Sequence, residues 1–401
     1  MERTLDVLLT KSRLTKDSKL LLQCLHLNEL PDLSAYTWVY ELNLGNNNIS
    51  KIERSKFPPN LTVLELYQNK LTTISVNDIP EGVTDLSVSS NSITEFDGSL
   101  FTNLKKLILS SNDTITFKYP PNITGLDISN NSLRKIDDFP QNLVEIDCSN
   151  NFLSMLPKLN DKLTKIDMSH NEISIFPEFP DTTIMISAST NKICEVKKLP
   201  SGIEELDLKD NKINTIDCIL PPSLTTLNLC DNLLTEMPDL PTNIEDVDIS
   251  NNRISELKEI PESVRILDVS DNMLTEIPDE LKKRPKLKFS CHKNLCDDNS
   301  DDDEFDYETF WSRGKSSTPI NTTNTSYQQY SGTGYKLSDY SSSPQYTTTH
   351  YYQGRPYTSY NFNSSYIDRL RGEMSSVYAN SKAKKSNPNY VSIRNKKNII
   401  V

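Results

Sequence analysis

Long hydrophobic runs are absent from this sequence. Residues 1 to 30 contain no apolar stretch behind a basic segment, and no stretch elsewhere reaches the length that crosses a bilayer. We therefore predict neither a signal peptide nor a transmembrane segment. We expect an intracellular, cytoplasmic protein, in the cytoplasm of a host cell if the chain is viral or an effector.

Positive charge is also scarce. The chain has 43 Lys and Arg against 55 Asp and Glu, which gives a formal net charge of -12. An acidic chain is repelled by polyanions, so the charge disfavours nucleic acid and anionic membranes as partners.

Cysteine and glycine are few. The seven cysteines are odd in number and mostly occupy positions of the repeat described below, which favours reduced, intracellular thiols over a disulfide framework. Only 10 glycines accompany abundant Asn, Lys, Ile and Tyr. This composition suggests an AT-rich genome, such as that of a large DNA virus, a protist or an intracellular bacterium.

The sequence does contain a nine-residue frame, Leu-x-x-Leu-x-Leu-x-x-Asn, seen clearly in LTTLNLCDN at residues 224–232. It recurs at steps of 19 to 22 residues, a regularity typical of a stacked solenoid. The asparagines of the frame are Asn47, Asn69, Asn91, Asn112, Asn131, Asn151, Asn171, Asn191, Asn211, Asn232, Asn252 and Asn272.

One repeat predicts a short strand, a turn and an extended return. Val247 and Ile249 alternate with Asp246 and Asp248, the period-two pattern of a half-buried strand. The return carries prolines such as Pro261, which resist a helix interior. The predicted fold is therefore a repeat solenoid, mainly β.

A single repeat cannot fold alone. About five apolar side chains contribute roughly 1.5 to 3 kcal/mol each, whereas ordering about 20 residues costs roughly 1 to 2 kcal/mol per residue. Neighbouring repeats must supply the difference by stacking. We expect each frame asparagine to pair inward-turning backbone groups, whose loss would cost roughly 1 to 3 kcal/mol.

From Leu22 to Cys296, the frame and its trailing Ile-Pro or Leu-Pro resemble the leucine-rich repeat family. The repeat length and phrases such as MPDLP, at Met237 to Pro241, are similar to the short bacterial-effector type. The resemblance implies a horseshoe with a concave parallel sheet and an extended convex side. It also implies recognition of a protein by the concave face.

Composition divides the chain into four segments. We predict an N-terminal cap over 1–34, an array of about 12 repeats over 35–280 and a capping repeat over 281–296. The remainder, 297–401, begins with acidic residues, continues rich in Ser, Thr and Tyr, and ends basic. With so few aliphatic side chains it is predicted to be a disordered tail.

Acidic side chains recur between the two strand leucines, where they should face the concave groove. Strands about 4.8 Å apart would align them into a row for a protein with a basic surface. The alternative is structural: Asp and Ser bonding each other across strands. The predicted partner-binding residues are Glu65, Asp127, Asp147, Asp167, Asp207, Asp248 and Asp268.

Asp167, Ser169 and His170 contain the ingredients of a hydrolase triad. Asp and Ser recur at these positions in repeats without histidine, and a triad also needs an oxyanion hole. We predict no catalytic site here.

Cys291, His292, Cys296 and Asp297 form one loose group, whereas a structural zinc site shows two paired knuckles. We predict no metal and no cofactor. Cys296-x-Asp298 resembles the Cys-x-Asp motif of effector ubiquitin ligases with similar repeats, but their catalytic domain is helical and large.

We therefore predict a non-enzymatic protein–protein interaction module that binds a protein on its concave face. One alternative is a pathogen effector or ubiquitin-ligase-related substrate-recognition protein. Another is a structural or particle-associated protein that acts through its low-complexity tail. The oligomeric state is not predicted.

Overall fold

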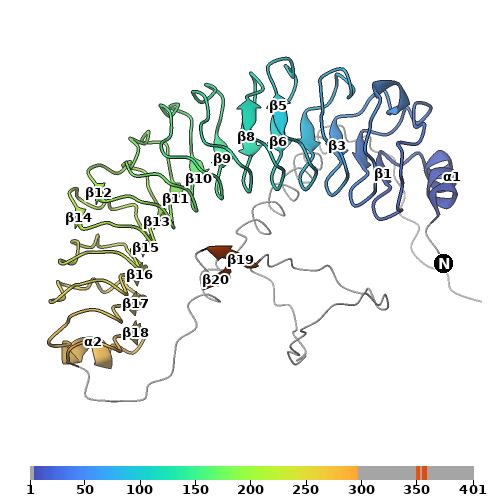
Figure 1. The fold of residues 1–401 in the computed structure, drawn as a ribbon. Coiled ribbons are helices and arrows are strands. Elements are labelled where there is room, and N and C mark those ends of the chain that lie inside the picture. Colours follow the sequence, from blue (N-terminus) through green and yellow to red (C-terminus); the bar gives the residue numbers. More distant parts are fainter. Residues whose placement is uncertain (1–3, 297–348, 353–354, 359–401) are drawn as a thin grey trace, which may run out of the picture. The chain divides into compact units, whose positions relative to one another are not determined.

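The computed structural model describes residues 4–296, 349–352 and 355–358, which fall into two units, Met1–Asp303 and Glu304–Val401. The first unit is a curved array of stacked turns with a 14-stranded sheet along its inner side (Figure 1). The strands are β1 (Lys19–Leu21), β2 (Glu41–Asn43), β3 (Val63–Glu65), β4 (Asp85–Ser87), β6 (Lys106–Ile108), β8 (Gly125–Asp127), β9 (Glu145–Asp147), β10 (Lys165–Asp167), β11 (Met185–Ser187), β13 (Glu205–Asp207), β15 (Thr226–Asn228), β16 (Asp246–Asp248), β17 (Ile266–Asp268) and β18 (Lys288–Ser290).

Every neighbouring pair in this sheet is parallel and pairs equivalent residues of successive repeats. Leu64 lies opposite Leu86, for example, and Leu206 lies opposite Leu227. The middle residue of each strand points into the core, and Leu64 is fully buried. The predicted β-solenoid with a parallel concave sheet is therefore confirmed.

The N-terminal end is covered by helix α1 (Leu5–Thr15). Leu8 and Leu9 pack against the core. The Trp38 indole Nε1 donates to the Ser12 hydroxyl over 3.2 Å, which ties the helix to the first repeat. Within the region assigned to the cap, β1 already belongs to the sheet.

The convex side is mostly extended, with two short parallel sheets added. These pair β5 (Glu95–Asp97) with β7 (Thr116–Lys118), and β12 (Glu195–Val196) with β14 (Thr215–Ile216). The Asp217 amide donates to the Val196 carbonyl over 2.8 Å. Pro157 and Pro177 occupy the position equivalent to Asp217 and have no N–H, so that bond cannot form there.

Two short helical segments interrupt the convex returns. A 3₁₀ turn, η1, spans Arg54–Lys56, and α2 spans Asp279–Lys283 in the last repeat.

A left-handed residue ends each strand turn. The residue before each frame asparagine has a positive φ, between 50° at Asn251 and 56° at Asp231. Such a backbone is unfavourable for most L residues but tolerated by Asn and Asp, which several repeats use here. The amides of this turn are bonded to the next repeat, as when Asn46 N–H donates to the Tyr67 carbonyl over 2.9 Å.

In the second unit, the structure describes an antiparallel pair, β19 (Thr349–Tyr352) and β20 (Arg355–Thr358). These eight residues belong to the segment predicted to be disordered, and the rest of that segment lies outside the described residues. Across the described part of the chain, no helix is both long enough and apolar enough to cross a membrane.

Candidate interaction surface

The first and third residues of each strand face away from the core, and together they form what we call the sheet face. In β3, Val63 and Glu65 are half-buried while Leu64 between them is buried. Because the strands pair in register, equivalent side chains form rows across the array. The sequence-predicted acidic residues lie at the third position of their strands.

Six of these acids form what we call the Asp row: Asp127, Asp147, Asp167, Asp207, Asp248 and Asp268. Asp127, Asp147 and Asp167 are consecutive register partners, and so are Asp248 and Asp268. Neighbouring strands of a sheet are about 4.8 Å apart, so these carboxylates are close neighbours.

The Asp row is more covered than its outward position suggests. Asp127 is 0% exposed, and Asp147, Asp248 and Asp268 are 5 to 6% exposed. Asp167, like Asp207 and Glu65, is half-buried. The row therefore lies on the sheet face but offers only part of its surface to a partner.

The carboxylates hold the ends of their own strands. Asp147 Oδ1 accepts the Ser149 amide over 3.0 Å and the Ser149 hydroxyl over 2.7 Å. We call this pairing the Asp-x-Ser clamp; it also occurs at Asp127, Asp167, Asp248 and Asp268. The clamp joins residues two apart in one repeat. A serine of a neighbouring strand also contributes to Asp127, Asp167 and Asp268, which is the cross-strand arrangement of the structural alternative from sequence.

Burial and like charge both disfavour ionisation of the row. Burial, with the neighbouring Asp167 and Asp127 carboxylates, raises the pKa of Asp147 well above its usual range, although hydrogen bonds from Ser149 oppose this. Burial likewise raises the pKa of Asp207 and of Asp248 to about 6. The sheet face therefore carries less negative charge near neutral pH than its residue count indicates.

The frame asparagines lie beneath this face and bond successive repeats. Asn252 Nδ2 donates to the carbonyls of Leu229, Ile249 and Ser250 over 2.9 to 3.1 Å, and its Oδ1 accepts the Leu234 amide over 3.0 Å. The same arrangement occurs at all twelve predicted positions, including the half-buried Asn91, so their amide groups are hydrogen-bonded to backbone.

A thirteenth asparagine, Asn294, was missed by the sequence reasoning. Its Nδ2 donates to the Val269 and Cys291 carbonyls, and its Oδ1 accepts the Leu274 amide over 3.1 Å. The frame is obscured there because Phe289 and Cys291 replace the strand leucines. The spacing of 22 residues from Asn272 is the signal that could have found it.

A second row of polar side chains, also missed, bonds the turns before the strands. Asn60 Nδ2 donates to the Thr37 carbonyl over 2.7 Å, and Asn122 Nδ2 donates to the Thr102 carbonyl over 2.9 Å. Asn243 makes the equivalent bond. Pro-x-Asn before the strand, at the repeat spacing, is its sequence signal.

Larger side chains gather on the sheet face near its N-terminal end. The Tyr67 ring lies against Gly45, where an added Cβ would come within 2.2 Å of the Tyr67 Cζ. Glu65 accepts a hydrogen bond from the Asn43 amide group, and Val63 is half-buried beside it. This end therefore offers an aromatic and aliphatic contact next to a carboxylate.

The triad ingredients are not arranged as a triad. The Ser169 hydroxyl donates to Asp167 Oδ1 over 2.6 Å as part of a clamp. His170 holds the left-handed turn position, with φ of 52°, and its burial lowers its pKa.

Among the described residues, no group of three or more His, Cys, Asp or Glu could hold a metal ion. His292 Nδ1 lies 3.1 Å from the hydroxyl oxygens of both Ser270 and Ser290. Asp297 and Asp298, which complete the two motifs noted around Cys296, lie outside the described residues.

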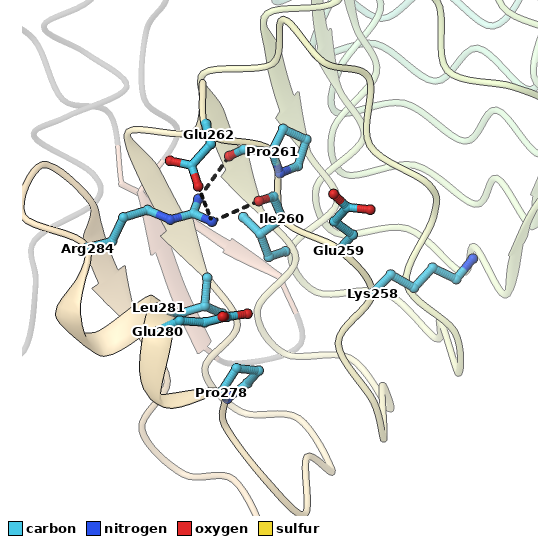
Figure 2. A pocket seen from close by; sticks show the side chains of 9 residues that line it. All are labelled: Lys258, Glu259, Ile260, Pro261, Glu262, Pro278, Glu280, Leu281 and Arg284. Carbon is cyan, nitrogen blue, oxygen red and sulfur yellow. Dashed lines mark hydrogen bonds and ion pairs between the residues drawn. The ribbon is translucent and has the colours of Figure 1, made fainter.

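A hollow between the last two repeats is shown in Figure 2, with Arg284 at its side. The Arg284 guanidinium donates to the Pro261 and Ile260 carbonyls over 2.9 Å each and lies 3.5 Å from a Glu262 carboxylate oxygen. The arginine thus closes the C-terminal end of the array by binding backbone carbonyls of the preceding turn. Its bonds are structural, so the hollow is a weaker candidate than the sheet face.

No protein-family profile matches this chain, and no curated protein matches it significantly. Solved structures do. The leucine-rich effector YopM from Yersinia pestis is 24% identical, with a TM-score of 0.57, and the match covers 72% of this chain and 93% of that one. The leucine-rich repeat domain of APL1B is 20% identical, with a TM-score of 0.57 and coverage of 73% and 99%. The functional domain of InlJ from Listeria monocytogenes is 21% identical, with a TM-score of 0.57 and coverage of 69% and 68%. These likenesses concern the fold.

Proposed function

We propose that this chain, which has the leucine-rich repeat fold, is a non-enzymatic recognition module that binds a protein partner on its sheet face. The observation that carries the proposal is the parallel sheet itself. Fourteen in-register strands present their first and third side chains on one side, while their middle residues form the core. A row of side chains on a rigid scaffold is suited to binding an extended protein surface.

The partner has a basic surface. Glu65, Asp167 and Asp207 are the half-buried members of the predicted acidic set. Glu65 lies on β3, and Asp167 and Asp207 lie on β10 and β13, with β11 between them. Charges of this kind act mainly on the association rate and on the choice of partner. Burial opposes the ionisation of the Asp row, Asp167 and Asp207 included, so the row contributes less charge than its residue count.

Aromatic contact supplies the anchor. Tyr67, with Val63 and Glu65 beside it, is the place on the face where a large side chain meets a carboxylate. Aromatic residues surrounded by polar groups commonly dominate binding free energy at protein interfaces.

The test compares two sets of three neutral substitutions in the full-length chain. Glu65→Gln, Asp167→Asn and Asp207→Asn remove charge from the sheet face. At Asp167 and Asp207 they keep the oxygen that accepts the amide two residues later. The matched control, Glu236→Gln, Glu256→Gln and Glu276→Gln, removes the same charge from exposed positions of the convex returns.

Proteins retained by the wild-type chain are identified, and their affinity for both variants is measured at two salt concentrations. We expect the sheet-face variant to bind at least about tenfold more weakly, and to lose most of the salt dependence. Equal binding by the two variants would refute the use of the sheet face.

A further inference from the structure

Three carboxylates of the Asp row, those of Asp127, Asp147 and Asp167, occupy consecutive strands in register. The Oδ1 atom of each is engaged by its own Asp-x-Ser clamp. Their Oδ2 atoms therefore remain for interactions with neighbours across the sheet.

Asp127 Oδ2 is fully buried and makes no hydrogen bond with any described residue. The hydroxyls of Ser110 and Ser129 hydrogen-bond to the Asp127 carboxyl group, yet its Oδ2 atom has no partner. Its register neighbours at the third strand position are Ile108 and Asp147. Ile108 has nothing to donate, and a buried acceptor without a donor costs free energy.

No cation of the described residues neutralises the three carboxylates. On the same face the first strand positions carry Lys106 on β6, Glu145 on β9 and Lys165 on β10, and neither lysine forms an ion pair with the Asp row. His170 lies near Asp167 but burial favours its neutral form, and the buried Cys148 thiol lies close to Asp147 and Asp167.

We propose that this cluster binds a proton near neutral pH, held on Asp147 and donated to Asp127 Oδ2. The proton satisfies the unpaired oxygen and removes one of three mutually repelling charges. This inference rests on the packing of the cluster and does not depend on the proposed partner.

The chain contains a precedent for the bond. At the equivalent third strand position of β2 and β3, the amide group of Asn43 donates to a carboxylate oxygen of Glu65 on the next strand. Asn43 Oδ1 at the same time accepts the Gly45 amide over 2.9 Å. An asparagine at this position thus accepts an amide of its own repeat and donates to a carboxylate one strand away. Asn43 donates toward the following strand, whereas Asp147 donates toward the preceding one.

The surroundings favour the protonated form. Burial is the largest cause that raises the pKa of Asp127, Asp147 and Asp167, and for Asp147 the two flanking carboxylates add to it. The folded chain therefore retains a proton that the unfolded chain releases above the ordinary Asp value of 3.8. Stability supplied by this proton is complete below that value and is lost as pH rises through the raised pKa.

The experiment measures the infrared carbonyl band of protonated carboxylic acids in the full-length protein at pH 7. We expect wild type to show the band and Asp147→Asn to lose intensity from it. The control Asp138→Asn, an exposed aspartate on the convex side with no clamp, should leave it unchanged. Absence of the band in wild type, or equal bands in all three proteins, overturns the proposal.

Thermal unfolding gives a second readout. Between pH 5 and pH 8, the wild-type melting temperature should fall by about 2 to 4 °C more than that of Asp147→Asn, whose amide cannot lose a proton. If the melting temperatures of wild type and Asp147→Asn change with pH by the same amount, the proposal is contradicted. If Asp147→Asn does not fold, Asp127→Asn is compared with wild type in its place. Loss of band intensity supports the shared proton, and an unchanged band overturns it, because Asp207 and Asp248 would then account for the band.

Discussion

The inner and outer sides of the array use the same local motif with opposite electrostatic results. Asp248 on the sheet face and Asp97 on the convex side each accept the amide of the serine two residues later over 3.0 Å. Asp248 is 5% exposed, and burial raises its pKa to about 6.

Asp97 is exposed, and hydrogen bonds from Ser99 and Lys118 lower its pKa to about 2. The Lys118 Nζ lies 2.9 Å from Asp97 Oδ2. An Asp-x-Ser sequence therefore fixes a turn without fixing the charge state, which depends on what covers the carboxylate.

The largest effect should come from breaking a buried inter-repeat bond set. Asn171 makes three donor bonds to carbonyls and accepts the Leu153 amide over 3.0 Å. Asn171→Ala leaves these buried groups unpaired, and we expect a loss of about 3 to 5 kcal/mol in urea unfolding. The matched control is Asn122→Ala, in the row of turns before the strands, where Asn122 Nδ2 donates to the Thr102 carbonyl at an exposed site. Its cost should stay near 1 kcal/mol. Similar losses of unfolding free energy in both variants would refute the contrast between the buried frame asparagines and the polar row before the strands.

A smaller effect is expected at Asp248. The folded pKa is raised, so the stability that the retained proton supplies is present below pH 3.8 and is lost as pH rises through about 6. Asp248→Asn preserves the clamp, as Asn228 does when its Oδ1 accepts the Cys230 amide. Between pH 4 and pH 8, wild type should therefore weaken by about 1 to 3 kcal/mol more than the variant. Denaturant unfolding at both pH values measures this difference. If the free energy of unfolding of wild type instead rises relative to that of the variant between pH 4 and pH 8, the prediction is wrong.

Sequence periodicity anticipated the sheet because the strand leucines and the asparagine recur with little variation. It could not anticipate how far the Asp row is covered. Alternation assigns Asp127 to the outward side, but Asp127 is buried, and its register neighbours Ile108 and Asp147 come from other repeats. The same reasoning missed Asn294, since the half-buried Phe289 and Cys291 stand at the positions where other repeats have buried strand leucines.

The outer side should respond to acid in the opposite direction. Asp97 has a lowered pKa, so the stability from its bonds is present above pH 3.8 and is lost as pH falls through about 2. Removing the cation with Lys118→Met should raise the pKa of Asp97 toward its ordinary value, with little change in stability at pH 7 because the pair is exposed. NMR titration of the Asp97 carboxyl group in wild type and Lys118→Met measures the change in its pKa. An unchanged pKa would leave Ser99 as the sole cause.

The smallest effect should come from restoring a missing donor on the convex side. Pro157→Ile supplies an N–H at the position where Asp217 donates to the preceding repeat, with Ile136 as the residue equivalent to Val196. The new bond would contribute about 0.5 to 1.5 kcal/mol, whereas losing proline frees the unfolded chain by about 0.4 to 1 kcal/mol. The two nearly cancel, so the free energy of unfolding should change by less than about 1 kcal/mol. Amide hydrogen exchange separates the terms, because residue 157 gains protection only if the convex pairing extends. A large destabilisation would show instead that Pro157 fixes the backbone conformation of the convex return. Substitutions on the outer side would then cost as much stability as substitutions on the inner side.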